Sequence, residues 1–228
     1  MEIFYERTKK MLGQDSIDRL LSSHVAILGV GGVGSWAVES LVRTGVGEIT
    51  LVDFDVIEYS NINRQIHALN SSVGKYKVDV MRNRLLDINP DLKVNIYKDK
   101  ITADSKFDFL INVDYTIDCI DDVRAKVAVI GWHIAKNKKI VSSMGTGNKF
   151  GNEPFKIVDI SKTKVCPLAR AVRQRLKKEG IYSGVPVLYS EELPYKINSG
   201  KEKPGTICFS PAIAGLKLGA YVVEDIIK

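Results

Sequence analysis

Four closely spaced glycines and a downstream aspartate are the first residues whose types and spacing indicate chemistry. They are Gly29, Gly31, Gly32, Gly34 and Asp53. Glycines carry no Cβ and let the backbone approach a phosphate, and a helix N-terminus adds free N–H groups and a partial positive charge. A carboxylate at the end of the following strand can accept both ribose hydroxyls. The spacing therefore predicts a nucleotide-binding turn, for NAD as well as for ATP, with a tight turn that binds nothing as the alternative.

Strands and helices that alternate along the chain must position these residues. Apolar runs at 25–28 and 49–52 predict strands on either side of a helix. Further strands are predicted at 93–97, 115–120 and 139–143, and helices at 75–88 and 123–136. The alternation predicts an α/β, Rossmann-like, doubly wound and mostly parallel sheet with helices on both faces and a C-terminal extension. Right-handed crossovers bring the carboxyl ends of the strands to one edge of the sheet. Ligands bind at this edge in open α/β sheets, and we call it the mouth of the site. We expect Asp53 and Asp121 to lie there together.

The composition is that of an ordinary globular protein. With 45% hydrophobic and 26% charged residues, the 228 residues suffice for one well-buried α/β domain. No apolar run has the length of a membrane span, and the N-terminus lacks the apolar core of a signal peptide, so we expect a cytoplasmic protein with no membrane partner. Cys119, Cys166 and Cys208 form no CxxC pair, which predicts reduced thiols and excludes a four-thiolate zinc site within this chain.

The two ends of the chain differ from this core. Residues 4–21 predict a helical lead-in with Ser16 as an N-cap. We therefore expect an N-terminal helical arm at 1–22, a core at 23–150, and a C-terminal extension at 151–228 that packs on the core as one domain.

The extension contains a basic segment. Residues 161–178 include seven lysines and arginines and no acidic residue. At helical spacing, the side opposite the apolar residues carries Arg170, Arg173 and Lys177, with Lys178 beside them. Such a face suits a phosphate backbone, with salt-dependent affinity; a merely solvated face is the alternative.

Polar residues that follow Asp53 extend the glycine pattern. They are Asp53-x-Asp55, Asn61-x-Asn63-Arg64, Lys77, and Asp121 after a strand. From about residue 7 to residue 144, the set resembles the ThiF/MoeB and ubiquitin-activating superfamily of adenylating enzymes. Those enzymes use a substrate carboxylate to attack the α-phosphate of ATP and form an acyl-adenylate and pyrophosphate. An NAD enzyme has no use for the Asn-x-x-Arg and Lys elements.

The resemblance implies a role for each residue and names ATP and Mg²⁺ as cofactors. The implied nucleotide-binding set is Gly29, Gly31, Gly32, Gly34, Asp53, Asp55, Asn61, Asn63, Arg64, Lys77 and Asp121. Asp53 would hold the ribose, Asn61, Arg64 and Lys77 would gather the phosphates, and Asp121 would be the metal ligand. In the family an arginine from the partner subunit's N-terminal arm also reaches the phosphates, and Arg7 matches that position. The implied catalytic set is Arg7, Arg64, Lys77 and Asp121, in a homodimer.

Several stretches make the resemblance more specific and extend it over nearly the whole chain. They are 61–69 (NINRQIHAL), 141–147 (VSSMGTG), 158–163 (VDISKT), 167–169 (PLA) and the basic helix. They are similar to the superfamily's dehydratases of threonylcarbamoyladenosine in tRNA. This implies that the adenylated carboxylate belongs to the threonyl group of the modified adenosine beside the anticodon. The carbamoyl group then closes on the activated carbonyl and expels AMP, and Arg170, Arg173, Lys177 and Lys178 would bind the tRNA.

Other functions remain open at this point. An activator of a ubiquitin-like sulfur carrier protein would use the same adenylation, although the missing zinc cysteines and the basic helix weigh against it. A NAD-dependent oxidoreductase and a non-catalytic RNA-binding module leave the polar set unexplained. A sulfur-relay protein is a further candidate partner. If thioester or persulfide chemistry occurred, Cys166 would be the nucleophile, because it lies in a basic loop. The threonylcarbamoyladenosine dehydratases that this chain resembles commonly have Asp at this position.

Overall fold

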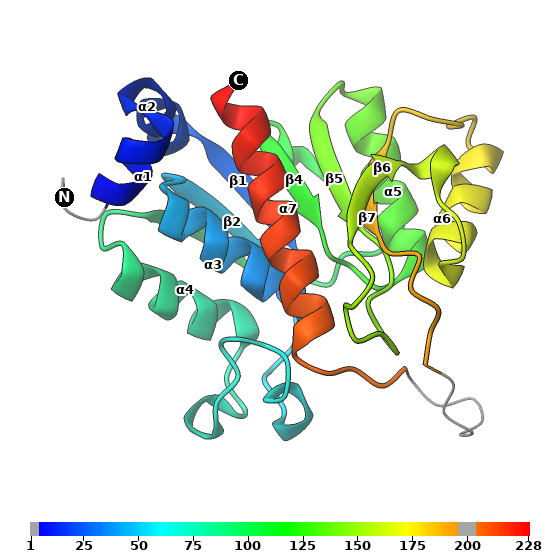
Figure 1. Cartoon of the computed structure of the whole chain (residues 1–228), viewed down its shortest axis with the longest axis horizontal. Helices are drawn as coiled ribbons and strands as arrows, with labels where there is room; N and C mark the ends of the chain where they lie inside the picture. Colours follow the sequence, from blue (N-terminus) through cyan, green and yellow to red (C-terminus); the bar gives the residue numbers. More distant parts are fainter. Residues whose placement is uncertain (1–4, 196–203) are drawn as a thin grey trace.

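The computed structural model describes residues 5–195 and 204–228, which surround one seven-stranded sheet (Figure 1). The strands are β1 (His24–Leu28), β2 (Glu48–Val52), β3 (Lys93–Tyr97), β4 (Tyr115–Asp118), β5 (Lys139–Ser143), β6 (Lys156–Asp159) and β7 (Pro186–Tyr189). The α-helices are α1 (Glu6–Leu12), α2 (Gln14–Ser22), α3 (Gly34–Thr44), α4 (Lys77–Ile88), α5 (Val123–Ala135), α6 (Pro167–Lys178) and α7 (Phe209–Ile227). Within this described part, no helix is both long and apolar enough to cross a bilayer.

The strand order confirms the predicted doubly wound, mostly parallel α/β sheet. In the order β3-β2-β1-β4-β5-β7-β6, every neighbouring pair is parallel except β7 and β6. Ile27 in the central strand β1 lies opposite Leu51 of β2 and Ile117 of β4. The order of the strands reverses between β1 and β4, and the crevice beyond the carboxyl ends of such a pair is where open α/β sheets bind ligands.

Alternating side chains of the strands build a core on each face of the sheet. In β1, Val25 and Ile27 join the core beneath α3, α4 and α7, whereas Ala26 and Leu28 join the core beneath α5 and α6. This is the period-two alternation of a strand that is buried on both faces. The sequence of β1 therefore contains no polar residue after His24.

Helix α7 lies across the sheet beside α3, and two glycines allow the contact (Figure 1). A Cβ on Gly215 would lie 2.4 Å from the carbonyl oxygen of Val33, and one on Gly219 would lie 2.1 Å from Ser40 Oγ. At Gly215 the closest atom belongs to the backbone and no other residue type fits, whereas at Gly219 the Ser40 hydroxyl would have to turn away. The C-terminal helix is therefore seated directly on the helix that follows the glycine turn.

The N-terminal arm differs from its prediction. Gly13, with φ of 82°, separates α1 from α2, and Ser16 lies inside α2. The Ser16 hydroxyl donates to the carbonyl oxygen of Leu12, so the prediction that Ser16 caps the helix is wrong. The Gly47 N–H, just before β2, donates to the Leu20 carbonyl oxygen, which places the arm at the edge where the strands begin.

Two strands also differ from the sequence prediction. Strand β4 ends at Asp118 rather than at residue 120, because the Asp118 carboxylate turns back to accept the N–H of Ile120. The sequence pattern does not predict the four residues of β7, although they separate β5 from β6. An apolar run of this length carries no period that distinguishes a strand from a buried loop.

A buried ion pair joins β4, β5 and α5. Lys126 and Asp118 are both fully buried and 2.8 Å apart. The Lys126 ammonium also donates to Ser142 Oγ and to the Ser143 carbonyl oxygen, each at 3.0 Å, while Ser142 donates to Asp118. All three ammonium protons therefore have acceptors, which offsets the cost of removing the charge from water.

Lys126→Met should destabilise the protein strongly, because it leaves the Asp118 carboxylate buried without its counter-charge. Urea titrations should show a loss of about 3–5 kcal/mol in the free energy of unfolding. Lys136→Met is the matched control, since Lys136 is exposed at the end of the same helix and should change stability by less than about 0.5 kcal/mol. A loss below about 1 kcal/mol for Lys126→Met would contradict this account.

Candidate active site

The glycine turn closes on itself at the carboxyl end of β1. Gly29 has φ of 91°, and its N–H donates to the Val52 carbonyl oxygen at 2.9 Å. A Cβ on Gly34 would lie only 2.0 Å from the Gly29 carbonyl oxygen, so the first residue of α3 is fixed as glycine. By contrast, a Cβ on Gly31 would have no described atom within 4 Å. The turn is therefore closely packed between Gly29 and Gly34 and has free space at Gly31. A phosphate needs such space to approach a helix N-terminus.

Asp53 lies buried beside this turn at the end of β2. Its carboxylate accepts the N–H of Val30 at 2.7 Å and the N–H of Asp55 at 2.9 Å. Burial raises the pKa of Asp53, and the charge of Lys77 together with these two backbone donors opposes that rise. The side chain is thus locked against the backbone of the glycine turn.

Lys77 and Asp55 form an ion pair next to Asp53. The Lys77 ammonium lies 2.7 Å from Asp55 Oδ2, and the Lys77 N–H donates to the Asp55 carbonyl oxygen at 3.0 Å. Lys77 opens α4 and is buried, whereas the Asp55 side chain is 45% exposed. The structure therefore brings Lys77 together with Asp53 and Asp55, two of the three carboxylates that the sequence predicted for this site.

Arg64 lies over the glycine turn. A Cβ on Gly32 would be 3.5 Å from Arg64 Cγ, and the indole N–H of Trp36 in α3 donates to the Arg64 carbonyl oxygen at 3.1 Å. Its guanidinium donates to the carbonyl oxygen of Ser60 and to Asn63 Oδ1. The loop between β2 and α4, which carries Arg64, projects beyond the sheet at the end where α7 begins (Figure 1).

The two asparagines of this loop have different surroundings. Asn61 is buried, and its Oδ1 accepts the N–H of Glu58, so it shapes the loop. Asn63 is exposed, and its amide donates to the Thr206 carbonyl oxygen at 2.8 Å. Asn63 thereby ties the loop to the segment that leads into α7.

Asp121 follows β4 at the same mouth. A Cβ on Gly29 would meet the Cys119 carbonyl oxygen at 2.9 Å, so the segment after β4 touches the glycine turn. Asp121 is exposed, while Asp122 caps α5 by accepting the N–H groups of Arg124 and Ala125. No group of three His, Cys, Asp or Glu residues in the described ranges could hold a metal ion by itself.

Arg7 is the one predicted catalytic residue that the chain does not bring to this mouth. It is exposed on α1, in the arm that packs where the strands begin. The glycine turn lies at the opposite edge, where the strands end. An Arg7 side chain can therefore reach a nucleotide on the turn only from another copy of the chain.

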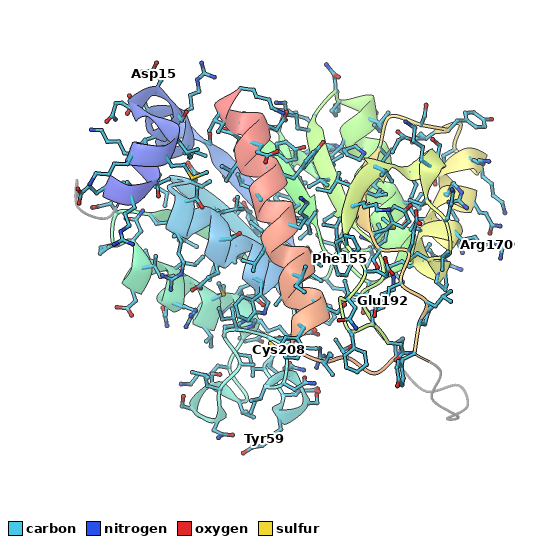
Figure 2. The ribbon with its side chains drawn as sticks, in the orientation of Figure 1. Asp15, Tyr59, Phe155, Arg170, Glu192 and Cys208 are labelled. Carbon is cyan, nitrogen blue, oxygen red and sulfur yellow. The ribbon has the colours of Figure 1, made fainter. Side chains whose placement is uncertain are left out.

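The basic helix α6 presents three of its four predicted RNA-binding side chains. Arg170, Lys177 and Lys178 are exposed, and Arg170 projects outward from α6 (Figure 2). Arg173 instead donates to the carbonyl oxygen of Thr163 at 2.9 Å and also to its hydroxyl. The prediction that Arg173 projects from the free side of the helix is thus wrong: it anchors α6 to the preceding turn.

Cys166 and Cys119 do not present reactive thiols. Cys166 is buried at the start of α6, and a Cβ on Gly145 would lie 3.5 Å from its sulfur. Burial, reinforced by the charge of Asp118, raises the pKa of Cys119 to about 12. Neither thiol is placed for thioester or persulfide chemistry.

The sequence leaves His67 open between a structural residue, the favoured interpretation, and a contact with the RNA or the substrate. The imidazole is buried, and neither ring nitrogen has a hydrogen-bond partner among the described residues. Burial, followed by the charges of Lys77 and Arg84, lowers its pKa to about 3. His67 is therefore a neutral packing residue beneath the Arg64 loop in this conformation, and no spacing in the sequence could have shown its burial.

Comparisons with known proteins agree with this geometry. The model of the ThiF family matches residues 5–216. The tRNA threonylcarbamoyladenosine dehydratase of Bacillus subtilis is 40% identical over 98% of this chain and 94% of its own length, and that of Escherichia coli is 36% identical over 91% and 79%. The crystal structure of the E. coli enzyme in complex with AMP superposes on this chain with a TM-score of 0.92 and 32% sequence identity. The match covers 99% of this chain and 94% of the E. coli chain. The chain belongs to the ThiF family.

Proposed function

We propose that this protein is an ATP-dependent dehydratase that acts on threonylcarbamoyladenosine in tRNA. The observation that carries the proposal is the extent of the similarity, because 98% of this chain aligns with a dehydratase of that name. The alignment therefore includes the extension with its basic helix as well as the glycine turn. An E. coli relative crystallised with ATP, at a TM-score of 0.92 and 31% identity, supports ATP as the nucleotide.

The reaction has two steps. The threonyl carboxylate attacks the α-phosphorus of ATP, forming the bond of an acyl-adenylate while the bond to pyrophosphate breaks. The carbamoyl group then attacks the activated carbonyl carbon and loses a proton, and AMP leaves with one former carboxylate oxygen. Since the ring closes within one nucleotide, proximity replaces a protein nucleophile. The buried state of Cys166 fits this route.

The side chains at the mouth divide the work of the first step. Asp53, held by two backbone N–H groups, receives the ribose hydroxyls. Arg64 and Lys77, with Asn61, Asn63 and Asp55 around them, gather the phosphates and offset the charge that builds at the α-phosphoryl group. Lys77 exchanges its Asp55 contact for a phosphate oxygen on binding.

A magnesium ion shared between the protein and the phosphates of ATP would fit the carboxylate at this mouth. Asp121 supplies one exposed carboxylate, and Mg²⁺ is commonly held by one or two carboxylates, phosphate oxygens and water. When bound, the ion neutralises part of the charge on the phosphates. Asp121 would hold the ion through its carboxylate.

We further propose a cytoplasmic homodimer in which the three parts of each chain have separate tasks. Residues 1–22 form the arm that delivers Arg7 to the partner, 23–150 form the adenylating core, and 151–228 form the RNA-binding extension. The position of α1 at the far edge of its own sheet supports the exchange. On the extension, Arg170, Lys177 and Lys178 contact the tRNA backbone while Arg173 holds the helix in place.

The deciding experiment is mass spectrometry of nucleosides from threonylcarbamoyladenosine-containing tRNA incubated with the protein, ATP and Mg²⁺. We expect the modified nucleoside to lose one water and AMP to accumulate in equal amount. If a sample that binds ATP leaves the nucleoside unchanged, the tRNA substrate is wrong. Adenylation of a carrier protein's C-terminal carboxylate would then be the function to test.

Complementation between variants tests the exchange of Arg7. Arg7→Ala and Lys77→Ala homodimers should each lose about 10²–10³-fold in the rate of AMP formation, because each lacks a group that stabilises charge at the α-phosphoryl group. After the two variants are unfolded together and refolded, mixed dimers regain activity, since one of their sites has both residues.

The matched control is a mixture of Arg64→Ala with Lys77→Ala. Both residues lie at the same mouth, so every mixed dimer carries one lesion in each site and should stay inactive. If the Arg7→Ala and Lys77→Ala mixture also stays inactive, Arg7 is not supplied by the partner.

The salt dependence of tRNA binding tests the basic helix. The triple variant Arg170→Gln, Lys177→Gln, Lys178→Gln should bind tRNA more weakly, and the slope of log affinity against log salt should fall by about 2–3, because each lost phosphate contact releases one counterion fewer. Lys93→Gln, at the start of β3, is an exposed control that should leave the slope unchanged. An unchanged slope in the triple variant would remove α6 from the tRNA interface.

A further inference from the structure

Two aromatic rings stand exposed on loops at the same edge of the sheet as the glycine turn. Phe150 follows β5 and is 46% exposed, and Tyr195 follows β7 and is 65% exposed. Their ring centroids are 5.5 Å apart and the planes meet at 65°. No step assigned to the active site uses either ring.

The backbone holds this aromatic pair firmly although its rings are not buried. The Glu192 carboxylate accepts the N–H of Phe150 at 2.7 Å and the N–H of Gly151 at 2.9 Å. The Tyr195 N–H donates to the Asn148 carbonyl oxygen at 2.6 Å. Two loops that are far apart in the sequence are thereby clamped together, so the rings are presented in a fixed relation.

Beneath the pair lies a buried lysine. The Lys149 side chain points inward and donates to the Ser190 carbonyl oxygen at 2.9 Å, and its burial lowers its pKa. The chain thus turns a cation inward and leaves the next residue, Phe150, on the surface. This is the reverse of the order that burial of apolar area would favour.

On one side, the aromatic pair is continuous with the glycine turn. A Cβ on Gly151 would lie 3.0 Å from Ile213 Cδ1, and a Cβ on Gly32 would lie 3.2 Å from Pro211 Cβ. The first turn of α7 therefore contacts both the glycine turn and the residue next to Phe150. Glu192 and Cys208, the residue before α7, both lie toward the end of the molecule from which the Tyr59 loop projects (Figure 2).

On the other side, the same segment touches the start of the basic helix. A Cβ on Gly145 would lie 3.5 Å from Cys166 Sγ and 3.8 Å from Leu168 Cβ, at the N-terminal end of α6. Arg170 follows in the first turn of that helix. The residues between Gly145 and Gly151 thus lie between the glycine turn and the exposed cations of α6.

We propose that Phe150 and Tyr195 form a stacking platform for a nucleobase of the single-stranded loop that carries the substrate nucleotide. An RNA whose backbone follows α6 and whose target carboxylate reaches the glycine turn must pass over this pair. Bases of single-stranded RNA loops are unstacked and are commonly bound by aromatic side chains. The inference rests on the proposed function, and it assigns the platform to RNA rather than to a second copy of the chain.

Kinetics with the intact protein and tRNA test the platform. Phe150→Ala combined with Tyr195→Ala should raise KM for tRNA about 5- to 150-fold, the range expected from the loss of one stacked base. KM for ATP should not change, which shows that the variant is folded and that the nucleotide site is intact. The aromatic exchanges Phe150→Tyr and Tyr195→Phe should retain the wild-type KM for tRNA.

Ile111→Ala is the control, because Ile111 is 45% exposed and lies just before β4, at the edge of the sheet where the strands begin and away from α6. It should leave KM for tRNA unchanged. An unchanged KM for tRNA in the double variant, or a change in its oligomeric state without a change in tRNA affinity, would overturn the proposal. The second result would assign the pair to a contact between copies.

Fluorescence gives a readout that does not depend on turnover. In Tyr195→Trp, addition of the anticodon stem-loop should quench the new indole by stacking, beyond the signal of Trp36 and Trp132 in the wild type. Ile111→Trp should show no additional quenching. Quenching without turnover by the wild-type enzyme would count against the proposed reaction and for the platform, whereas turnover without quenching would count against the platform alone.

Discussion

The site depends on a contact between two pieces of backbone at the centre of the sheet. Where β1 ends, Gly29 touches the carbonyl of Cys119 at the end of β4, and Gly34 touches Gly29 itself. This packing can form only without side chains, and it fixes where α3 begins. The places of Asp53 and Asp121 follow from it, because Asp53 directly follows β2 and Asp121 lies three residues after β4, and both strands neighbour β1. A change in this contact would move every group of the mouth together.

The charged side chains of the free site already have polar partners. Lys77 forms an ion pair with Asp55, Arg64 donates to neutral oxygens of Ser60 and Asn63, and Asp53 accepts two N–H groups. Under the proposed function, a ligand phosphate replaces such partners instead of meeting bare charges, so the net gain from each contact is smaller than its geometry suggests. In return the side chains are held ready, with little rearrangement left for the reaction step.

Local sequence patterns predicted most of the fold and the composition of the mouth. The bounds of β3 and β5 match the predicted runs, because an apolar run between turn signals is short-range information. The errors arise where a contact outside the periodic pattern determines the structure. Arg173 bonds to Thr163 rather than to solvent, and Ser16 lies inside a helix because Gly13 ends the preceding one. Helical spacing alone places a side chain on a face and does not show what lies against it.

The order of the strands also governs when the protein can fold. Strand β5 is buried along most of its length, yet its outer edge is covered only by β7, whose residues come more than forty positions later. Until β7 and α7 have been synthesised, the nascent chain has an unpaired parallel edge on β5, which contains the buried Ile140 and Val141, and an uncovered face on α3. The glycine turn, Asp53 and Lys77 all precede residue 150, but the last strand and the helix that cover their sheet come later in the chain.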